Sequence, residues 1–177
     1  MPGSWSPPTD WIRVTALDVH TAGEPLRILT GGLPSIPGET ILDKRRHAMS
    51  HLDDLRTALM WEPRGHADMY GAILTEPTTD DADAGVLFLH NEGFSTMCGH
   101  GIIGLAMAGV QAGVVPAGSS RHEVAQENGD GSGGGNGSEL WLDTPAGRVV
   151  ARSHRRGGRI VSASFLNVPS FVYALDR

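Results

Sequence analysis

The only cysteine of the chain, Cys98, lies in the run Met97-Cys98-Gly99-His100-Gly101, where an apolar strand is predicted to turn into a helix. Backbone N–H groups at a helix start lack intrahelical partners and favour a nearby negative charge. A thiol there is expected to have a lowered pKa and a larger thiolate fraction. The glycines let a carboxylate approach the N–H groups closely. A base beside a carboxylate-binding turn is the arrangement required to remove a proton alpha to a carboxylate.

Two interpretations of Cys98 and of His100 stay open on their residue types alone. Cys98 is either a reactive base or a small buried hydrophobic residue, which is the commoner role of a free cysteine. His100 is too close in sequence to be oriented like the histidine of a distant triad, and it either contacts a bound ligand or caps its own helix. The helix-start position and the neighbouring glycines favour the functional interpretation of both residues.

Two further pairs of polar residues could bind a ligand. His47 and His51 lie one helical turn apart, a spacing that can bind a metal ion, but no third ligand of fitting spacing accompanies them. We therefore expect no metal site. His20 and Glu24 belong to a predicted turn, where they either face a pocket or form hydrogen bonds with the local backbone.

The segment 61–68 is rich in ionisable residues and contains Pro63, which should end the preceding helix. Its Arg64 could clamp a carboxylate through the planar guanidinium group. The alternative is an ion pair with Glu62 or Asp68, as in an ordinary solvated loop. His66, in the same loop, has no assigned role.

Length, charge and cysteine content exclude several classes of protein. The 177 residues suffice for one domain with a hydrophobic core, and 40% of them are hydrophobic. The net charge of −6, without a basic run longer than Lys44-Arg45-Arg46, argues against nucleic acid and an anionic membrane as partners. A single cysteine excludes an intrachain disulfide. Because the first ten residues lack the apolar run of a signal peptide, we expect a cytoplasmic protein.

Hydrophobic periodicity and turn residues predict the elements that position these side chains. Residues 1–10 are predicted to be a loose segment. Strands 12–19 and 26–30 should form a hairpin about the turn 20–25, followed by an amphipathic helix 40–60 with Thr40 and Asp43 at its start. Further strands are predicted at 69–76, 86–90 and 160–165, together with a hairpin of strands 139–142 and 148–151 and an apolar stretch at 171–175.

The helix that follows Cys98 is predicted to be the centre of the fold. Residues 102–112 are almost wholly apolar or small, so this helix should be buried on every side, and Gly113 should end it. Residues 126–138 form a glycine-rich insert that we expect to be disordered, exposed and without phosphate-binding chemistry. Many short strands with two helices indicate an α+β domain whose sheet curls around the central helix.

The run Met97–Gly101 resembles the first catalytic-cysteine motif of the proline racemase superfamily. The preceding residues, His90-Asn91-Glu92-Gly93-Phe94-Ser95-Thr96, resemble the trans-3-hydroxy-L-proline dehydratase branch more than the racemase or 4-hydroxyproline epimerase branches. Segments 20–25, 44–46 and 62–71 match the superfamily as well. The similarity covers nearly the whole chain but only the first half of the family's pattern.

This resemblance implies a diaminopimelate-epimerase-like fold of two half-domains with the active site between them. Residues 11–177 would then be the N-terminal catalytic-cysteine domain, with the second domain and its second catalytic motif absent. In such a protein Cys98 is the catalytic base, and Gly99, His100 and Gly101 bind the substrate. The expected partner is a small-molecule substrate, no cofactor is expected, and a homodimer is one assembly that unpaired sheet edges would favour.

The reaction implied for the whole enzyme is dehydration of trans-3-hydroxy-L-proline to pyrroline-2-carboxylate. A proline racemase or 4-hydroxyproline 2-epimerase is the first alternative, because the second catalytic motif decides between these activities. A further alternative is an inactive module that binds amino acids. A metal hydrolase is the least favoured class, since no spaced set of His, Asp and Glu ligands is present.

Overall fold

The computed structural model describes residues 6–115, 123–124 and 137–169 of the chain. Residues 6–10, within the predicted loose segment, form no helix or strand. Most of the predicted insert 126–138 and all of the stretch 171–175 lie outside the described residues. Gly137 and Ser138 are the first residues of a strand, so the predicted end of the insert was wrong by two residues.

The described helices and strands follow one another in an order that mixes the two types. They are β1 (Thr15–Thr21), β2 (Glu24–Gly31), α1 (Ile41–His51), α2 (Asp53–Met60), β3 (Tyr70–Thr75), β4 (Ala84–His90), β5 (Gly93–Ser95), α3 (Gly99–Gly104), the π-helix η1 (Leu105–Gly109), β6 (Glu123–Val124), β7 (Gly137–Thr144), β8 (Gly147–Arg156) and β9 (Arg159–Leu166).

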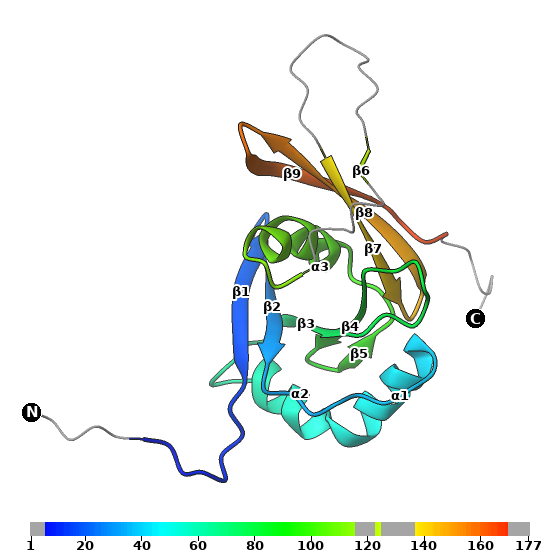
Figure 1. Ribbon diagram of the computed structural model, residues 1–177. Helices are drawn as coiled ribbons and strands as arrows, with labels where there is room; N and C mark the ends of the chain where they lie inside the picture. The colour runs from blue at the N-terminus through cyan, green and yellow to red at the C-terminus, as the bar shows by residue number, and fades with distance from the viewer. Residues whose placement is uncertain (1–5, 116–122, 125–136, 170–177) are drawn as a thin grey trace, which may run out of the picture.

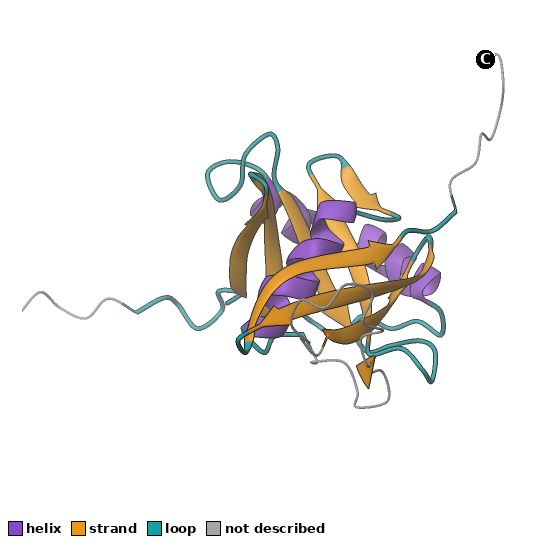
Figure 2. Ribbon diagram, turned by 90° about the horizontal axis from the view of Figure 1, so that it is seen from above, coloured by secondary structure: helices purple, strands orange, loops and turns teal. Residues whose placement is uncertain are grey.

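The nine described strands form one mixed sheet in the order β1-β2-β3-β4-β7-β8-β9, with β5 paired to β4 and β6 paired to β7. The pairs β2–β3 and β4–β7 are parallel, and the other described pairs are antiparallel. The sheet curls around α3, while α1 and α2 cover its outer face (Figure 1). Viewed from above, strands lie on both sides of the central helix (Figure 2). The predicted α+β fold with a curled sheet is therefore confirmed.

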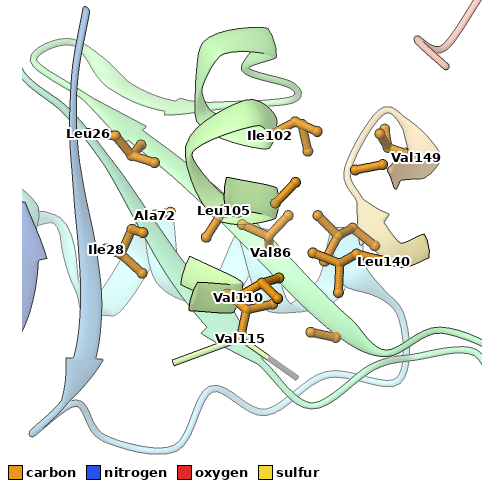
Figure 3. Close-up of a cluster of buried hydrophobic side chains, with 14 of the residues drawn as sticks. Leu26, Ile28, Ala72, Val86, Ile102, Leu105, Val110, Val115, Leu140 and Val149 are labelled. Carbon is orange, nitrogen blue, oxygen red and sulfur yellow. The ribbon is translucent and has the colours of Figure 1, made fainter. Parts of the chain in front are cut away.

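Two hydrophobic clusters hold the layers together. The first fills the concave side of the sheet, where Ile102 and Leu105 of the central helix lie among side chains of β2, β4, β7 and β8 (Figure 3). The second lies between the outer face and the helices α1 and α2, and it includes Leu87 and Leu89. Because β4 contributes to both clusters, six of its seven residues are buried, as its unbroken apolar run indicates.

The first hairpin is tighter than predicted. Strand β1 continues through Thr21 and β2 begins at Glu24, so the turn consists of Ala22 and Gly23 rather than the whole segment 20–25. Both turn residues have positive φ, 52° and 100°, as two-residue turns between twisted strands require.

The predicted helix 40–60 is present but divided in two. Its start is confirmed, because Thr40 and Asp43 form a reciprocal capping box. Leu52 leaves the helical conformation, with φ −121° and ψ 11°, and it is buried in the outer cluster. The break lets α1 and α2 follow the curved sheet, a tertiary requirement that the apolar spacing does not reveal.

The central helix runs from Gly99 through α3 and η1 to Gln111. Ile102, Leu105 and Val110 are buried, whereas Met107 is only half-buried and Gln111 is exposed. The prediction of burial on every side was therefore wrong for one side, because the described sheet encloses the helix only partly. Gly113, with φ 71°, follows the end of this helix as predicted.

The C-terminal strands agree with the sequence in type and extend further than predicted. β7 and β8 pair as a hairpin around Pro145 and Ala146, and β9 pairs with β8 after the turn at 157–158.

No helix in the described ranges is long and apolar enough to span a membrane.

Candidate active site

Cys98 lies between β5 and α3 and lines a pocket of about 880 Å³. We call this hollow the Cys98 pocket. Its walls come from residues 23–25 in the turn before β2 and at its start, the loop before β3 (66–68), Tyr70, residues 90–92 at the end of β4 and in the following turn, Ser95 and residues 97–100. The cysteine is 6% exposed, so its sulfur lies at the boundary between the core and the pocket.

The expected lowering of the Cys98 pKa is wrong. Burial raises the pKa of this thiol to about 11, and the carboxylate of Glu24 raises it further. The backbone N–H of Gly101 acts in the opposite direction, but Cys98 forms no side-chain cap hydrogen bond with the helix start. Without a ligand, the residue at the helix start is therefore a neutral thiol.

His100 lies against the thiol and lines the Cys98 pocket, where a bound ligand can contact it. Its Nδ1 and Nε2 atoms are 3.5 Å and 3.6 Å from the Cys98 sulfur. The ring packs edge-on against Tyr70 with 4.6 Å between centroids. Thr21 holds the backbone here, because its hydroxyl donates a hydrogen bond of 3.0 Å to the His100 carbonyl.

The pocket brings together Cys98, Gly99 and His100, while Gly101 lies behind them. Gly101 is buried, and a Cβ added to it would come within 2.7 Å of the Phe88 ring and 3.1 Å of the Cys98 sulfur. This position therefore requires glycine so that the helix start can approach β4 and the thiol.

The open alternatives for His20, Glu24 and Arg64 have three different outcomes. His20 accepts a hydrogen bond of 3.2 Å from the Gly23 N–H, which is the local-backbone alternative. Glu24 lines the Cys98 pocket, which is the other alternative. Among the described residues Arg64 forms no ion pair with Glu62 or Asp68; its Nε donates to the Ala58 carbonyl at 2.6 Å, and it is not among the residues that line the Cys98 pocket.

The two histidines with metal-binding spacing contact each other. His47 and His51 stack with 4.2 Å between ring centroids on α1. Within residues 6–115, 123–124 and 137–169, no group of three His, Cys, Asp or Glu side chains could hold a metal ion. His66, which had no assigned role, lines the Cys98 pocket.

Sequence reasoning missed three residues at this site. Tyr70 lies beside His100, and Ser95 lines the pocket three residues before Cys98. Asn91 joins the β4–β5 turn to the charged loop, because its Nδ2 donates to the carbonyls of Met60 and His66. All three lie in the segments 62–71 and 90–96, whose resemblance to the superfamily was their signal in the sequence, and Tyr70 reaches the site because it pairs with His90.

The curled sheet around a central helix and the thiol at the start of that helix define a class of cysteine-containing epimerase-like domains. A family model described as proline racemase matches residues 16–177 of the chain. The chain therefore belongs to the proline racemase family.

Known relatives extend this assignment. A trans-3-hydroxy-L-proline dehydratase from Bacillus cereus is 50% identical over 162 residues, which are 92% of this chain and 44% of the relative. A 3-hydroxyproline 2-epimerase from Burkholderia multivorans is 42% identical over 163 residues, which are 92% of this chain and 44% of the relative. The crystal structure of a hydroxyproline epimerase from Agrobacterium vitis with bound trans-4-hydroxy-L-proline has a TM-score of 0.74 and 29% identity, over 93% of this chain and 44% of that one. The chain thus spans less than half the length of these proteins.

Proposed function

We propose that this chain supplies the cysteine half of an enzyme that dehydrates trans-3-hydroxy-L-proline to pyrroline-2-carboxylate without a cofactor. The observation that carries the proposal is the Cys98 sulfur beside His100, both lining one polar pocket. The similarity to dehydratases at up to 50% identity supports the choice of substrate.

In the proposed reaction, the backbone N–H groups of Gly99 and His100 hold the substrate carboxylate. The Cys98 thiolate takes the alpha proton, and the electron pair of that C–H bond forms a C2–C3 double bond as the C3–O bond breaks. The proton on Cys98 then passes to the departing hydroxide, which leaves as water. One sulfur serves both transfers, since the alpha hydrogen and the hydroxyl lie on the same ring face in the trans isomer.

The thiol must first lose its own proton. The raised pKa of Cys98 makes the thiolate rare, but it also makes the thiolate a stronger base. The His100 ring, 3.5 Å from the sulfur, is positioned to accept this proton. Gly101 contributes through its backbone N–H, which lowers the thiol pKa and so opposes the effect of burial.

An epimerase or racemase is the second candidate function. It is favoured by the 42% identical relative named as a 3-hydroxyproline 2-epimerase. Inversion at the alpha carbon needs an acid and a base on opposite faces of the ring, so a second group opposite Cys98 would have to supply the proton.

The deciding assay offers trans-3-hydroxy-L-proline, trans-4-hydroxy-L-proline and L-proline to the protein in its longest natural form. Release of a pyrroline from the first substrate, abolished by Cys98→Ala, supports the dehydratase. Inversion of any substrate without release of water supports the epimerase or racemase. A Cys98→Ala variant that retained the wild-type dehydration rate would refute the role of the thiol.

The third candidate function is an inactive module that binds amino acids. Pyrrole-2-carboxylate is a planar mimic of the deprotonated substrate, and its binding can be measured by calorimetry. Binding without turnover of the three substrates would support the module and exclude the dehydratase.

A further inference from the structure

The hydroxyl group of Ser95 lacks a hydrogen-bond partner at the candidate active site. Its Oγ is buried and has no partner among the described residues, a property that it shares only with the Nε of Arg148. Ser95 lines the same pocket as Cys98. Buried hydroxyls are nearly always hydrogen-bonded, because burial without a partner costs about 1–3 kcal/mol.

Strand pairing sets the direction of the Ser95 side chain. Ser95 is directly opposite Phe88 in the antiparallel pair of β4 and β5. Residues opposite each other in such a pair point to the same face. Phe88 belongs to the concave cluster together with Cys98, whereas Phe94, the neighbour of Ser95, belongs to the outer cluster beneath α1 and α2. The Ser95 hydroxyl therefore lies on the face of the sheet that carries the thiol.

The position and chemistry of this hydroxyl fit a neutral polar group on a ligand. Ser95 precedes Cys98 on the strand side, while Gly99 and His100 follow it at the helix start, where a carboxylate is favoured. A serine hydroxyl can both donate and accept, as can an alcohol on a substrate. A ligand that placed its carboxylate at the helix and its alpha carbon over the sulfur would extend its ring toward β5.

We propose that Ser95 determines specificity by forming a hydrogen bond with the ring hydroxyl of the substrate. This inference rests on the proposed dehydratase function and names the residue that would distinguish a hydroxylated ring from proline. The hydroxyl of Ser95 donates to the C3 oxygen while the C3–O bond breaks, and it stabilises the charge that develops there. A substrate without the hydroxyl leaves Ser95 unpaired, which is how buried polar groups reject such analogues.

The test compares Ser95→Ala with the wild-type protein in its longest natural form. For trans-3-hydroxy-L-proline, kcat/KM should fall about 10- to 100-fold, since one hydrogen bond to a developing charge is lost. Affinity for pyrrole-2-carboxylate, which has no ring hydroxyl, should change less than about threefold. Thermal unfolding of both proteins checks that the substitution leaves the fold intact.

Thr96→Ala is the matched control. It removes a hydroxyl from the adjacent, exposed residue and should leave both measurements unchanged. The proposal is overturned if Ser95→Ala retains its kcat/KM for trans-3-hydroxy-L-proline, and the dehydratase function then still stands. It is also overturned if binding of pyrrole-2-carboxylate falls equally, since Ser95 would then be structural. A wild-type protein that releases no pyrroline overturns the dehydratase and the Ser95 assignment together.

Discussion

The thiol of Cys98 should react with alkylating reagents more slowly than an exposed cysteine and with a different pH dependence. Because burial raises its pKa to about 11, the reactive thiolate increases about tenfold per pH unit between roughly pH 7 and pH 10. An unperturbed cysteine, with a pKa near 8.5, levels off above about pH 9. Mass spectrometry of protein treated with iodoacetamide measures this rate, and a plateau near pH 8 would contradict the raised pKa.

The raised pKa of Cys98 also makes the free energy of unfolding depend on pH. The folded thiol has a higher pKa than an unperturbed cysteine, so the unfolded chain ionises first as the pH rises. The contribution of Cys98 to the free energy of unfolding is therefore complete below about pH 9 and is lost as the pH approaches 11. Urea unfolding of wild type and Cys98→Ser across this range should show the difference.

At the residue level, the sequence could locate the site but not predict the direction of the Cys98 pKa shift. The run Met97–Gly101 indicated the helix start, and the structure places Cys98, Gly99 and His100 on one pocket. Local sequence says nothing about the burial of the sulfur or about the approach of Glu24 from another strand. These two long-range effects reverse the direction of the pKa shift.

Helix α2 is fixed to the pocket wall through Arg56, whose side chain is 7% exposed. Its Nη1 donates to the carbonyls of His90 and Asn91 at 2.9 Å and 2.6 Å, and its Nε donates to Asp53. Arg56→Ala should lower the free energy of unfolding by about 2–3 kcal/mol, since partly buried, charge-assisted hydrogen bonds to two carbonyls are lost.

Arg46→Ala is the control for this prediction, measured by urea unfolding in parallel. Arg46 pairs with Asp43 at the same three-residue spacing, but its side chain is 74% exposed, so its loss should have a much smaller effect. Equal changes in the two variants would show that the contacts with the β4–β5 turn contribute nothing to stability.

Elements whose signals are local were predicted well, and elements shaped by packing were not. The capping box at Thr40 and the hairpin of β7 and β8 depend on residues close in sequence. The break at Leu52 depends on the curvature of the sheet beneath the helices. The spacing of apolar residues alone carries no information about this curvature.

The whole sheet depends on a short junction between β4 and β7. These strands pair at only two positions, Ala84 with Leu142 and Gly85 with Asp143. The buried Asp143 carboxylate reinforces the junction by accepting hydrogen bonds from the backbone N–H groups of Thr78 and Thr79. Asp143→Ala should lower the free energy of unfolding by about 1–3 kcal/mol, because the partly buried hydrogen bonds to Thr78 and Thr79 are lost.

Hydrogen exchange and urea unfolding would test this prediction. Protection of amides in β4 and β7 should fall together in Asp143→Ala. Asp81→Ala, which removes an exposed partner of Arg148, should change protection far less. If the first variant kept full protection of β7, the side-chain contacts would not be what joins the two parts of the sheet.

At the scale of the molecule, the fold class was predictable and the strand order was not. Many short strands and one apolar helix indicate a curled sheet around that helix, as the structure confirms. The parallel pairs β2–β3 and β4–β7 join strands that are distant in sequence. Their register depends on packing around the central helix, which single-strand patterns do not encode.

The hydrogen bond from Thr21 to the His100 carbonyl joins positions 79 residues apart. During synthesis at about 5–20 residues per second, Thr21 leaves the ribosome roughly 4–16 s before its partner does. For part of that interval, until β3 has been made, the edge of β2 with which β3 later pairs is open to hairpins of neighbouring nascent chains. Co-translational misassembly is therefore expected first at this hairpin.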